Sequence, residues 1–164
     1  MSQVAVIDCG TNSIRLLIAE TSGSTIKELI RTMEIVRLGQ GVDENKAFHP
    51  DAINRTLLAV KSFKEIIDKN KVDKIRFCAT SATRDAANRN LFIDGVRDIL
   101  NVQVEVIPGE EEAALSFTGA TYQLDQSSGP FLVVDIGGGS TEFVYGDKKV
   151  INAKFQVVLI LIQK

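Results

Sequence analysis

The sequence predicts an α/β domain built on a mixed β-sheet, with three antiparallel strands at the N-terminus followed by alternating helices and strands. Three observations carry this prediction. Apolar runs of strand length fill the first 37 residues, helix and strand patterns alternate from residue 50 to about 124, and a further strand pair follows residue 130. The chain has 164 residues, of which 45% are hydrophobic and 24% are charged, as is typical of a folded globular protein.

The N-terminal part is predicted to be an antiparallel meander. Residues 3–9 (QVAVIDC) and 13–20 (SIRLLIAE) are apolar runs of strand length, and residues 24–37 continue the pattern as one long or two short strands. Gly10-Thr11-Asn12 and Ser22-Gly23 supply the turns between these runs. The first three strands are therefore expected to pair in chain order.

Alternating helices and strands are expected after a loop over residues 38–49, which ends at the helix-flanking residue His49. Pro50 marks a first helical position, and apolar residues from Ile53 to Ile67 then recur at helical spacing. Strands joined by helices in this way are usually parallel. The remaining expected elements are a strand over 73–79, a short helix after Thr80-Ser81, a helix over 89–100, a strand over 102–107, a helix over 109–123, a linker over 126–130, and strands over 131–136 and 141–146.

Composition excludes several classes of protein. A single histidine makes His-based metal clusters impossible, and Cys9 and Cys78 alone cannot form a zinc site and favour a reducing compartment. The apolar runs are too short for a transmembrane helix, and the N-terminus lacks the basic start of a signal peptide. We therefore expect a cytoplasmic protein with no membrane partner. A net charge of −2 and a pI near 5.5 disfavour nucleic-acid binding.

The charges are distributed unevenly along the chain. From Arg55 to Arg97 there are ten Lys or Arg and five Asp or Glu residues. From Asp98 to Asp147 there are nine acidic residues and no Lys or Arg. The acidic stretch indicates either a solvated face or carboxylates gathered to hold a divalent cation and a catalytic base. The basic segment is a candidate path for a polyanionic substrate.

A repeat with an offset of 127 residues links Val6–Arg15 to Val133–Glu142. Aspartate, glycine and serine coincide in the two copies, and apolar strands flank each turn. Unlike the P-loop, each turn leads into a strand, so the turn of a β-hairpin would offer backbone N–H groups and hydroxyls to an anion. The aspartate before each turn is placed to hold a metal directly or through water. Two such loops facing each other would clamp phosphates from both sides.

Four segments carry a resemblance to a known family: AVIDCGTNSIRLLIAE (5–20), ATSATRDAANR (79–89), VIPGEEEAALSFTGA (106–120) and FLVVDIGGGSTEFVYG (131–146). Together they resemble the exopolyphosphatase / guanosine pentaphosphate phosphatase family, which belongs to the superfamily of actin, sugar kinases and chaperone ATPases. The resemblance implies a ribonuclease H-like (actin-like ATPase) domain. It also implies that water hydrolyses a terminal phosphoanhydride of inorganic polyphosphate or of guanosine pentaphosphate.

The resemblance also implies roles for individual residues. Glu111 resembles the general base that activates water, and its neighbours Glu110 and Glu112 leave a one-residue shift open. Mg²⁺ is the expected metal, because it pairs with few carboxylates plus phosphate oxygens. The other implied residues are the metal ligands Asp135 and Glu142 with Asp8 as a third, the phosphate-contacting Arg84, a first phosphate loop of Gly10, Thr11, Asn12 and Ser13, and a second of Gly137, Gly138, Gly139, Ser140 and Thr141.

A purely structural role is also open to each of these residues. Acidic residues in the first turn of a helix complement the helix dipole. Thr80 or Ser81 could simply cap the next helix, although that N-terminus, with Arg84 one turn along, would also suit an anion. Arg84 could instead form a surface salt bridge. Glu142 could occupy an exposed strand position, and Arg15 could contact solvent rather than phosphate.

The sequence departs from the family pattern at two places. Ala114 stands where the family commonly has arginine after Glu-Glu-Ala, and family members continue well beyond the second phosphate loop. We therefore expect a truncated form, with a first domain over 1–124 and the opening hairpin of a second over 125–164. The apolar run within 155–162 is expected to be covered by this chain or by a second copy in a homodimer. Two further functions stay open: a kinase or ATPase of the same superfamily, and a non-catalytic phosphate-binding or dimerisation module.

Overall fold

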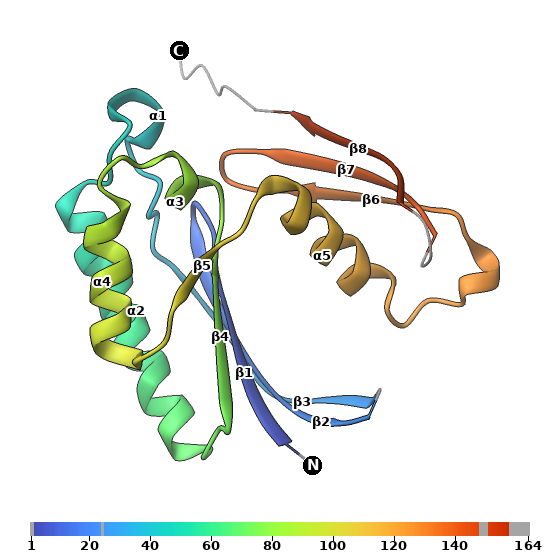
Figure 1. The fold of residues 1–164 in the computed structure, drawn as a ribbon, viewed down its shortest axis with the longest axis horizontal. Helices are drawn as coiled ribbons and strands as arrows, with labels where there is room; N and C mark the ends of the chain where they lie inside the picture. The colour runs from blue at the N-terminus through green and yellow to red at the C-terminus, as the bar shows by residue number, and fades with distance from the viewer. Residues whose placement is uncertain (1, 24, 148–150, 158–164) are drawn as a thin grey trace. The chain divides into compact units, whose positions relative to one another are not determined.

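The computed structural model of the chain describes residues 2–23, 25–147 and 151–157 (Figure 1). The chain divides into two compact units, Met1–Val106 and Ile107–Lys164. Unit 1 contains β1 (Ser2–Cys9), β2 (Ser13–Ser22), β3 (Thr25–Ile35), α1 (Val42–Asn45), α2 (Pro50–Lys69), β4 (Lys74–Ala79), α3 (Ser81–Asp85), α4 (Arg89–Leu100) and β5 (Val104–Val106). Unit 2 contains α5 (Gly109–Thr121), the 3₁₀ helix η1 (Gln126–Ser128), β6 (Phe131–Ile136), β7 (Thr141–Gly146) and β8 (Ile151–Val157).

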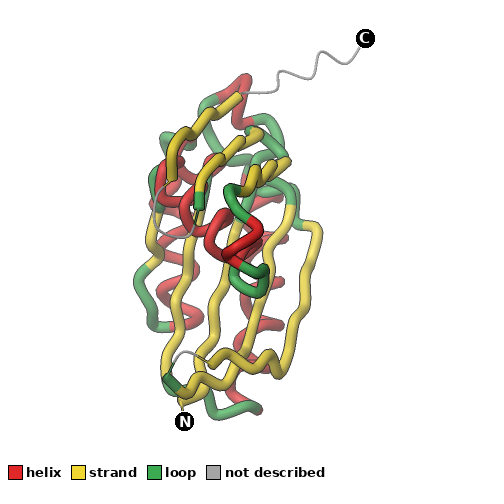
Figure 2. Tube along the Cα trace, turned by 90° about the vertical axis from the view of Figure 1, so that its right-hand side faces the viewer, coloured by secondary structure: helices red, strands yellow, loops and turns green. Residues whose placement is uncertain are grey.

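Unit 1 is a five-stranded mixed sheet of order β3-β2-β1-β4-β5. The first three strands pair antiparallel, and β4 and β5 join parallel to β1, so the predicted fold class is confirmed. Figure 2 shows the long strands side by side. The carboxyl ends of parallel strands meet at one edge of a sheet. The residues that follow Cys9 and Ala79 are therefore neighbours, and the Thr80 amide donates to the Cys9 carbonyl at 3.1 Å.

The core of unit 1 lies between the sheet and helices α2 and α4, which cover the same face (Figure 1). Strand residues alternate between the two faces, so every second residue along the central parts of β1 and β2 enters the core. Phe92 of α4 packs edge-on against Phe77 of β4, with ring centroids 6.2 Å apart. The fully buried aliphatic residues of β1 and β2 are Ile7, Ile14, Leu16 and Ile18.

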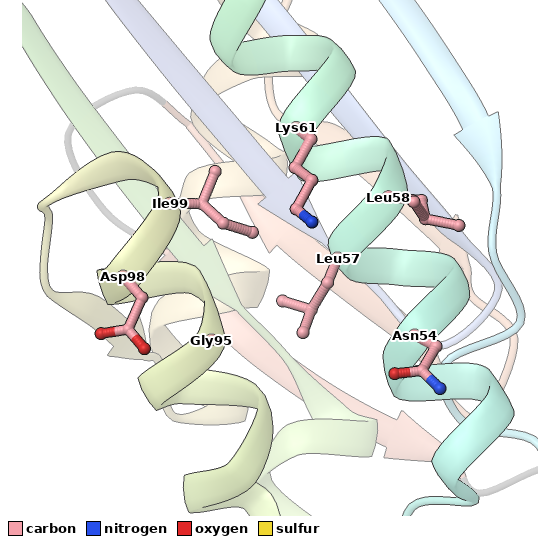
Figure 3. A pocket seen from close by; sticks show the side chains of 7 residues that line it. All are labelled: Asn54, Leu57, Leu58, Lys61, Gly95, Asp98 and Ile99. Carbon is pink, nitrogen blue, oxygen red and sulfur yellow. The ribbon is translucent and has the colours of Figure 1, made fainter.

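A shallow groove of about 550 Å³ runs between α2 and α4 (Figure 3). Leu57 and Ile99 line it, with Lys61 and Asp98 on opposite walls. The helices approach closely at Gly95, where an added Cβ would lie 2.6 Å from a Leu57 methyl group. The groove contains no predicted catalytic, phosphate-loop or metal-binding residue, and its cation Lys61 belongs to the basic segment.

Unit 2 is a three-stranded antiparallel sheet of order β6-β7-β8, with α5 packed on it through Ala113 and Phe117. The predicted strands at 131–136 and 141–146 are confirmed. The sequence pattern did not predict β8, which pairs with β7, or the one-turn helix α1 inside the expected loop. Of the apolar run, residues 158–162 lie outside the described residues. The domain boundary predicted after residue 124 stays a prediction; compactness alone divides the chain at 106/107.

Two minor expectations have clear outcomes. His49 is the residue that caps α2, and its Nδ1 accepts a hydrogen bond from the Asp51 amide at 3.2 Å. Cys9 faces the core and Cys78 the opposite face, because Cys78 is aligned with Asp8 and Cys9 with Ala79, and neither forms a disulfide. Burial raises the pKa of the Cys9 thiol, so this thiol stays protonated. No helix in the described part of the chain is long and apolar enough to cross a membrane.

The Arg76–Glu105 ion pair predicts an acid-dependent contribution to stability. The Arg76 guanidinium donates to Glu105 at 2.7 Å, and this hydrogen bond lowers the pKa of Glu105 below its ordinary value of 4.5. A lowered carboxyl pKa stabilises the fold above the unfolded-state pKa, and this stabilisation is lost as the pH falls through the folded-state pKa. Glu105→Gln should therefore cost up to about 1 kcal/mol at pH 7, the range of exposed pairs, and less at pH 3.

Urea denaturation of wild type and Glu105→Gln at both pH values measures this difference. A difference that persists unchanged at pH 3 would mean that the pair contributes nothing through its charge.

Candidate active site

The first copy of the repeat is the β1–β2 hairpin of unit 1. Its turn is closed by a hydrogen bond from the Gly10 amide to the Ser13 carbonyl at 3.0 Å. Asp8, at the end of β1, lies directly opposite Arg15 of β2, and the two side chains form an ion pair at 3.2 Å. The sequence left phosphate and solvent open as contacts of Arg15. In the structure its side chain pairs with Asp8 instead.

The second copy, the β6–β7 hairpin of unit 2, is closed in the same way. The Gly137 amide donates to the Ser140 carbonyl at 2.8 Å, at positions 127 residues after those of the first hairpin. A Cβ at Gly137 would lie 3.0 Å from that carbonyl oxygen, so a side chain would strain this turn. The sequence repeat is therefore a repeat of backbone geometry, and both turns have the form that the sequence predicts.

The two copies differ in the residue that lies opposite the aspartate, on the second strand of the hairpin. Asp135 lies directly opposite Glu142, where the first copy has Arg15 opposite Asp8. Directly opposed residues of an antiparallel pair have Cβ atoms about 5 Å apart and on the same face, so the second hairpin holds two carboxylates together. Glu142 is only 3% exposed, so it is not an ordinary exposed strand residue.

Two serine hydroxyls donate to this carboxylate pair. Ser140 donates to Glu142 and Ser116 of α5 donates to Asp135, each at 2.6 Å. Thr141, which precedes Glu142 and therefore faces the other side of β7, is 6% exposed, and its hydroxyl has no hydrogen-bond partner among the described residues. Gly137 and Gly138 are exposed, so no side chain would block an anion that approaches the backbone of this turn.

Glu111 begins α5 together with Glu110 and Glu112, and the Glu111 amide donates to the Pro108 carbonyl at 3.0 Å. Carboxylates in this first turn complement the helix dipole, whatever else they do. The Glu111 side chain is exposed, so water reaches it. Because Ser116 ties α5 to Asp135, the helix that carries Glu111 is fixed to the strand that carries the carboxylate pair.

Arg84 lies on α3, directly after β4 and next to the first hairpin. The Ser81 and Thr11 hydroxyls share a hydrogen bond of 2.8 Å, which joins the start of α3 to the first turn. Thr80 occupies the N-cap position of α3, but its side chain makes no capping bond. The half-buried Arg84 is one turn along, and its amide donates to the Thr80 carbonyl at 3.0 Å.

The predicted site residues therefore form two groups, one in each unit. Unit 1 brings together the first turn, Asp8 and the Arg84 helix, and unit 2 brings together the second turn, the carboxylate pair and the Glu111 helix.

Several cations of the basic segment are already paired with carboxylates, including Lys64 with Asp68 and Arg76 with Glu105. Sequence reasoning missed Ser116. The only hint of its role in the sequence is that a small polar residue stands next to an apolar residue, Phe117, on the predicted helix.

The carboxylate pair fits a divalent cation with few protein ligands. Mg²⁺ is commonly held by one or two carboxylates and completes its shell with water and phosphate oxygens. Asp135 and Glu142 supply such a pair. Within the described residues, no three His, Cys, Asp or Glu side chains cluster as a ready-made metal site. A cation here would thus depend on phosphate oxygens and water for its remaining ligands.

A model of the Ppx/GppA phosphatase family matches residues 17–156. The chain belongs to this family. It is 45% identical over 160 residues to exopolyphosphatase 2 of Mycobacterium tuberculosis, covering 92% of this chain and 50% of that protein. The chain thus spans about half the length of the curated relatives it matches first.

Solved structures of relatives show the same fold. An exopolyphosphatase-like protein is 45% identical, with a TM-score of 0.90 over 96% of this chain and 51% of that one. An exopolyphosphatase from Cytophaga hutchinsonii is 34% identical, with the same TM-score and the same coverage of both chains. These likenesses confirm the predicted family and the actin-like α/β fold.

Proposed function

We propose that this chain carries the phosphate- and metal-binding part of a phosphatase that releases terminal phosphate from inorganic polyphosphate. The observation that carries the proposal is the repeated hairpin, closed by the same backbone bond in both copies, with two opposed carboxylates in the second. Family membership and the name of the mycobacterial relative support polyphosphate as the substrate class.

The two turns and Arg84 have the chemistry to bind and orient phosphate. Backbone N–H groups of a tight turn form an anion-binding concavity, and the planar guanidinium of Arg84 can donate two parallel hydrogen bonds to one phosphate. We assign phosphate binding to Gly10–Ser13 and Gly137–Thr141. Phosphoryl transfer depends mainly on such positioning and on neutralising charge.

Asp135 and Glu142 would hold Mg²⁺, which when bound neutralises charge on the phosphate oxygens. Asp8 is the weaker candidate ligand, because Arg15 already neutralises it. Hydroxyl bonds from Ser116 and Ser140 fix the two carboxylates for this role.

Glu111 is proposed as the general base. It takes a proton from a water molecule, whose oxygen forms a bond to the terminal phosphorus. The bond from that phosphorus to the bridging oxygen breaks, and the shortened chain leaves with its negative charge. A base in this role must lie within hydrogen-bond reach of the water in the substrate complex.

Orthophosphate release by the purified chain with Mg²⁺ tests the proposal, with polyphosphate, guanosine pentaphosphate and ATP as parallel substrates. Release from polyphosphate supports it, and release from guanosine pentaphosphate as well would extend it to both substrates of the family. Tight ATP binding without polyphosphate binding would favour a kinase or ATPase instead. Absence of both polyphosphate binding and phosphate release would contradict the proposal.

A further inference from the structure

Residues 36–42, which we call the strap, bond directly to the backbone of the first turn. The Val36 and Arg37 amides both donate to the Asn12 carbonyl at 2.9 Å, and the Gly39 amide donates to the Thr11 carbonyl at 2.9 Å. A trans peptide group points its C=O and N–H in opposite directions. By holding the carbonyls of Thr11 and Asn12, the strap therefore fixes the directions of the Asn12 and Ser13 N–H groups, which belong to the proposed phosphate loop.

The strap is itself held in place by the burial of its apolar residues and by bonds from Arg55. Its apolar residues Leu38 and Val42 are buried at 0% and 3% exposure. Arg55 of α2 donates from Nε to the Val36 carbonyl at 2.9 Å and from its terminal nitrogen to the Gln40 side chain at 3.2 Å. Arg37 has a positive φ of 48°, a conformation that is uncommon for residues other than glycine and that costs energy. The amide of this strained residue is the one that donates to the Asn12 carbonyl.

Gly39 lies where the strap passes between the first turn and α3. A Cβ at this position would be 2.4 Å from the Thr11 methyl carbon and 3.3 Å from the Ala82 Cβ. The first of these distances is too short for any real side chain, so the close approach requires glycine. The same Thr11 bonds through its hydroxyl to Ser81 of α3. Gly39 thus permits one compact unit of strap, turn and α3.

We propose that the strap positions the first phosphate loop for binding, and that Gly39 and Arg55 are positioning residues. This inference rests on the proposed function, because it concerns the same phosphate loop. Neither residue needs to touch phosphate. Their effect is transmitted through the Thr11 and Asn12 carbonyls, and misplacement of binding groups by about 1 Å can cost two orders of magnitude in rate.

A double-mutant cycle tests the role of Gly39. Gly39→Ala should weaken binding of inorganic polyphosphate about tenfold or more, because the new methyl group displaces Thr11. Thr11→Ser removes the colliding methyl group and keeps the hydroxyl that bonds Ser81. Because Thr11 itself belongs to the proposed phosphate loop, the double variant is compared with Thr11→Ser alone, and Gly39→Ala should cost little further affinity in that background. Calorimetric titration measures binding, and circular dichroism confirms that each variant is folded at that temperature.

Arg55 offers a second, independent arm. Arg55→Gln should weaken polyphosphate binding, whereas Arg31→Gln removes the same charge from β3, outside the basic segment, and should leave binding near that of wild type. Equal losses in both variants would mean that Arg55 acts only through its charge. That result, or unchanged binding in Gly39→Ala, would overturn the positioning role of the residue concerned.

Amide hydrogen exchange of Asn12 and Ser13, followed by NMR, separates this inference from the proposed function. Gly39→Ala should change both exchange rates, and the double variant should restore them, whether or not polyphosphate binds. If wild type binds no polyphosphate but the exchange pattern appears, the proposed function fails and the strap still orients the turn. If exchange is the same in all four proteins, the positioning role is wrong.

Discussion

Replacing Glu142 by glutamine should make the metal-free chain more stable and remove its stabilisation by Mg²⁺. Glu142 is 3% exposed and lies directly opposite Asp135, so two like charges face each other across the hairpin. Such pairs are destabilising by up to about 1 kcal/mol, and Glu142→Gln removes one charge while keeping an oxygen for the Ser140 bond. In wild type, Mg²⁺ at a hundredfold excess over its Kd should add about 2.7 kcal/mol.

The repeat supplies a matched control for this prediction. Asp135→Asn should behave like Glu142→Gln, whereas Asp8→Asn in the first hairpin should lose the Arg15 ion pair and become no more stable. Urea denaturation of the four proteins with and without Mg²⁺ measures both effects. Equal stabilisation by Mg²⁺ of wild type and both unit 2 variants would place the cation somewhere other than this pair.

Replacing Glu111 by glutamine should abolish phosphate release and leave polyphosphate binding unchanged. A general base contributes roughly 10²- to 10⁴-fold to a rate, and the amide cannot accept the proton from water. The change preserves the size of the side chain and one acceptor oxygen. Phosphate release under saturating polyphosphate, together with a binding titration, separates a loss of chemistry from a loss of affinity.

The neighbouring residues provide the controls for Glu111. Glu110→Gln and Glu112→Gln remove the same charge from the same first turn of α5, and both should keep most of the activity. If Glu112→Gln is the inactive variant, the base is assigned one residue too early. If all three variants are equally active, the acidic cluster serves the helix dipole alone, and the assigned mechanism is wrong.

The sequence could predict those parts of the fold and site that depend on side-chain identity. The repeat was visible because Asp8, Gly10 and Ser13 recur as Asp135, Gly137 and Ser140. Periodic apolar residues and Pro50 likewise placed α2 at its observed start. These signals are local, because each depends only on which residue types stand at nearby positions in the sequence.

The strap could not be predicted, because its bonds to the first turn come from backbone amides that almost every residue possesses. The positive φ of Arg37 and the close approach at Gly39 depend on tertiary contacts with Asn12 and Thr11. The burial of Glu142 also depends on tertiary contacts. A strand residue is buried or exposed according to what packs on its face, and here α5 packs on the sheet of unit 2.

The central claim is that both hairpins bind phosphate, and an NMR titration of the chain with inorganic polyphosphate and Mg²⁺ tests it most directly. We predict saturable shifts of the amides of Gly10–Ser13 and of Gly137–Thr141, with the second set reduced in Asp135→Asn. Shifts confined to lysines on the exposed side of α2, with both turns unchanged, would contradict the claim.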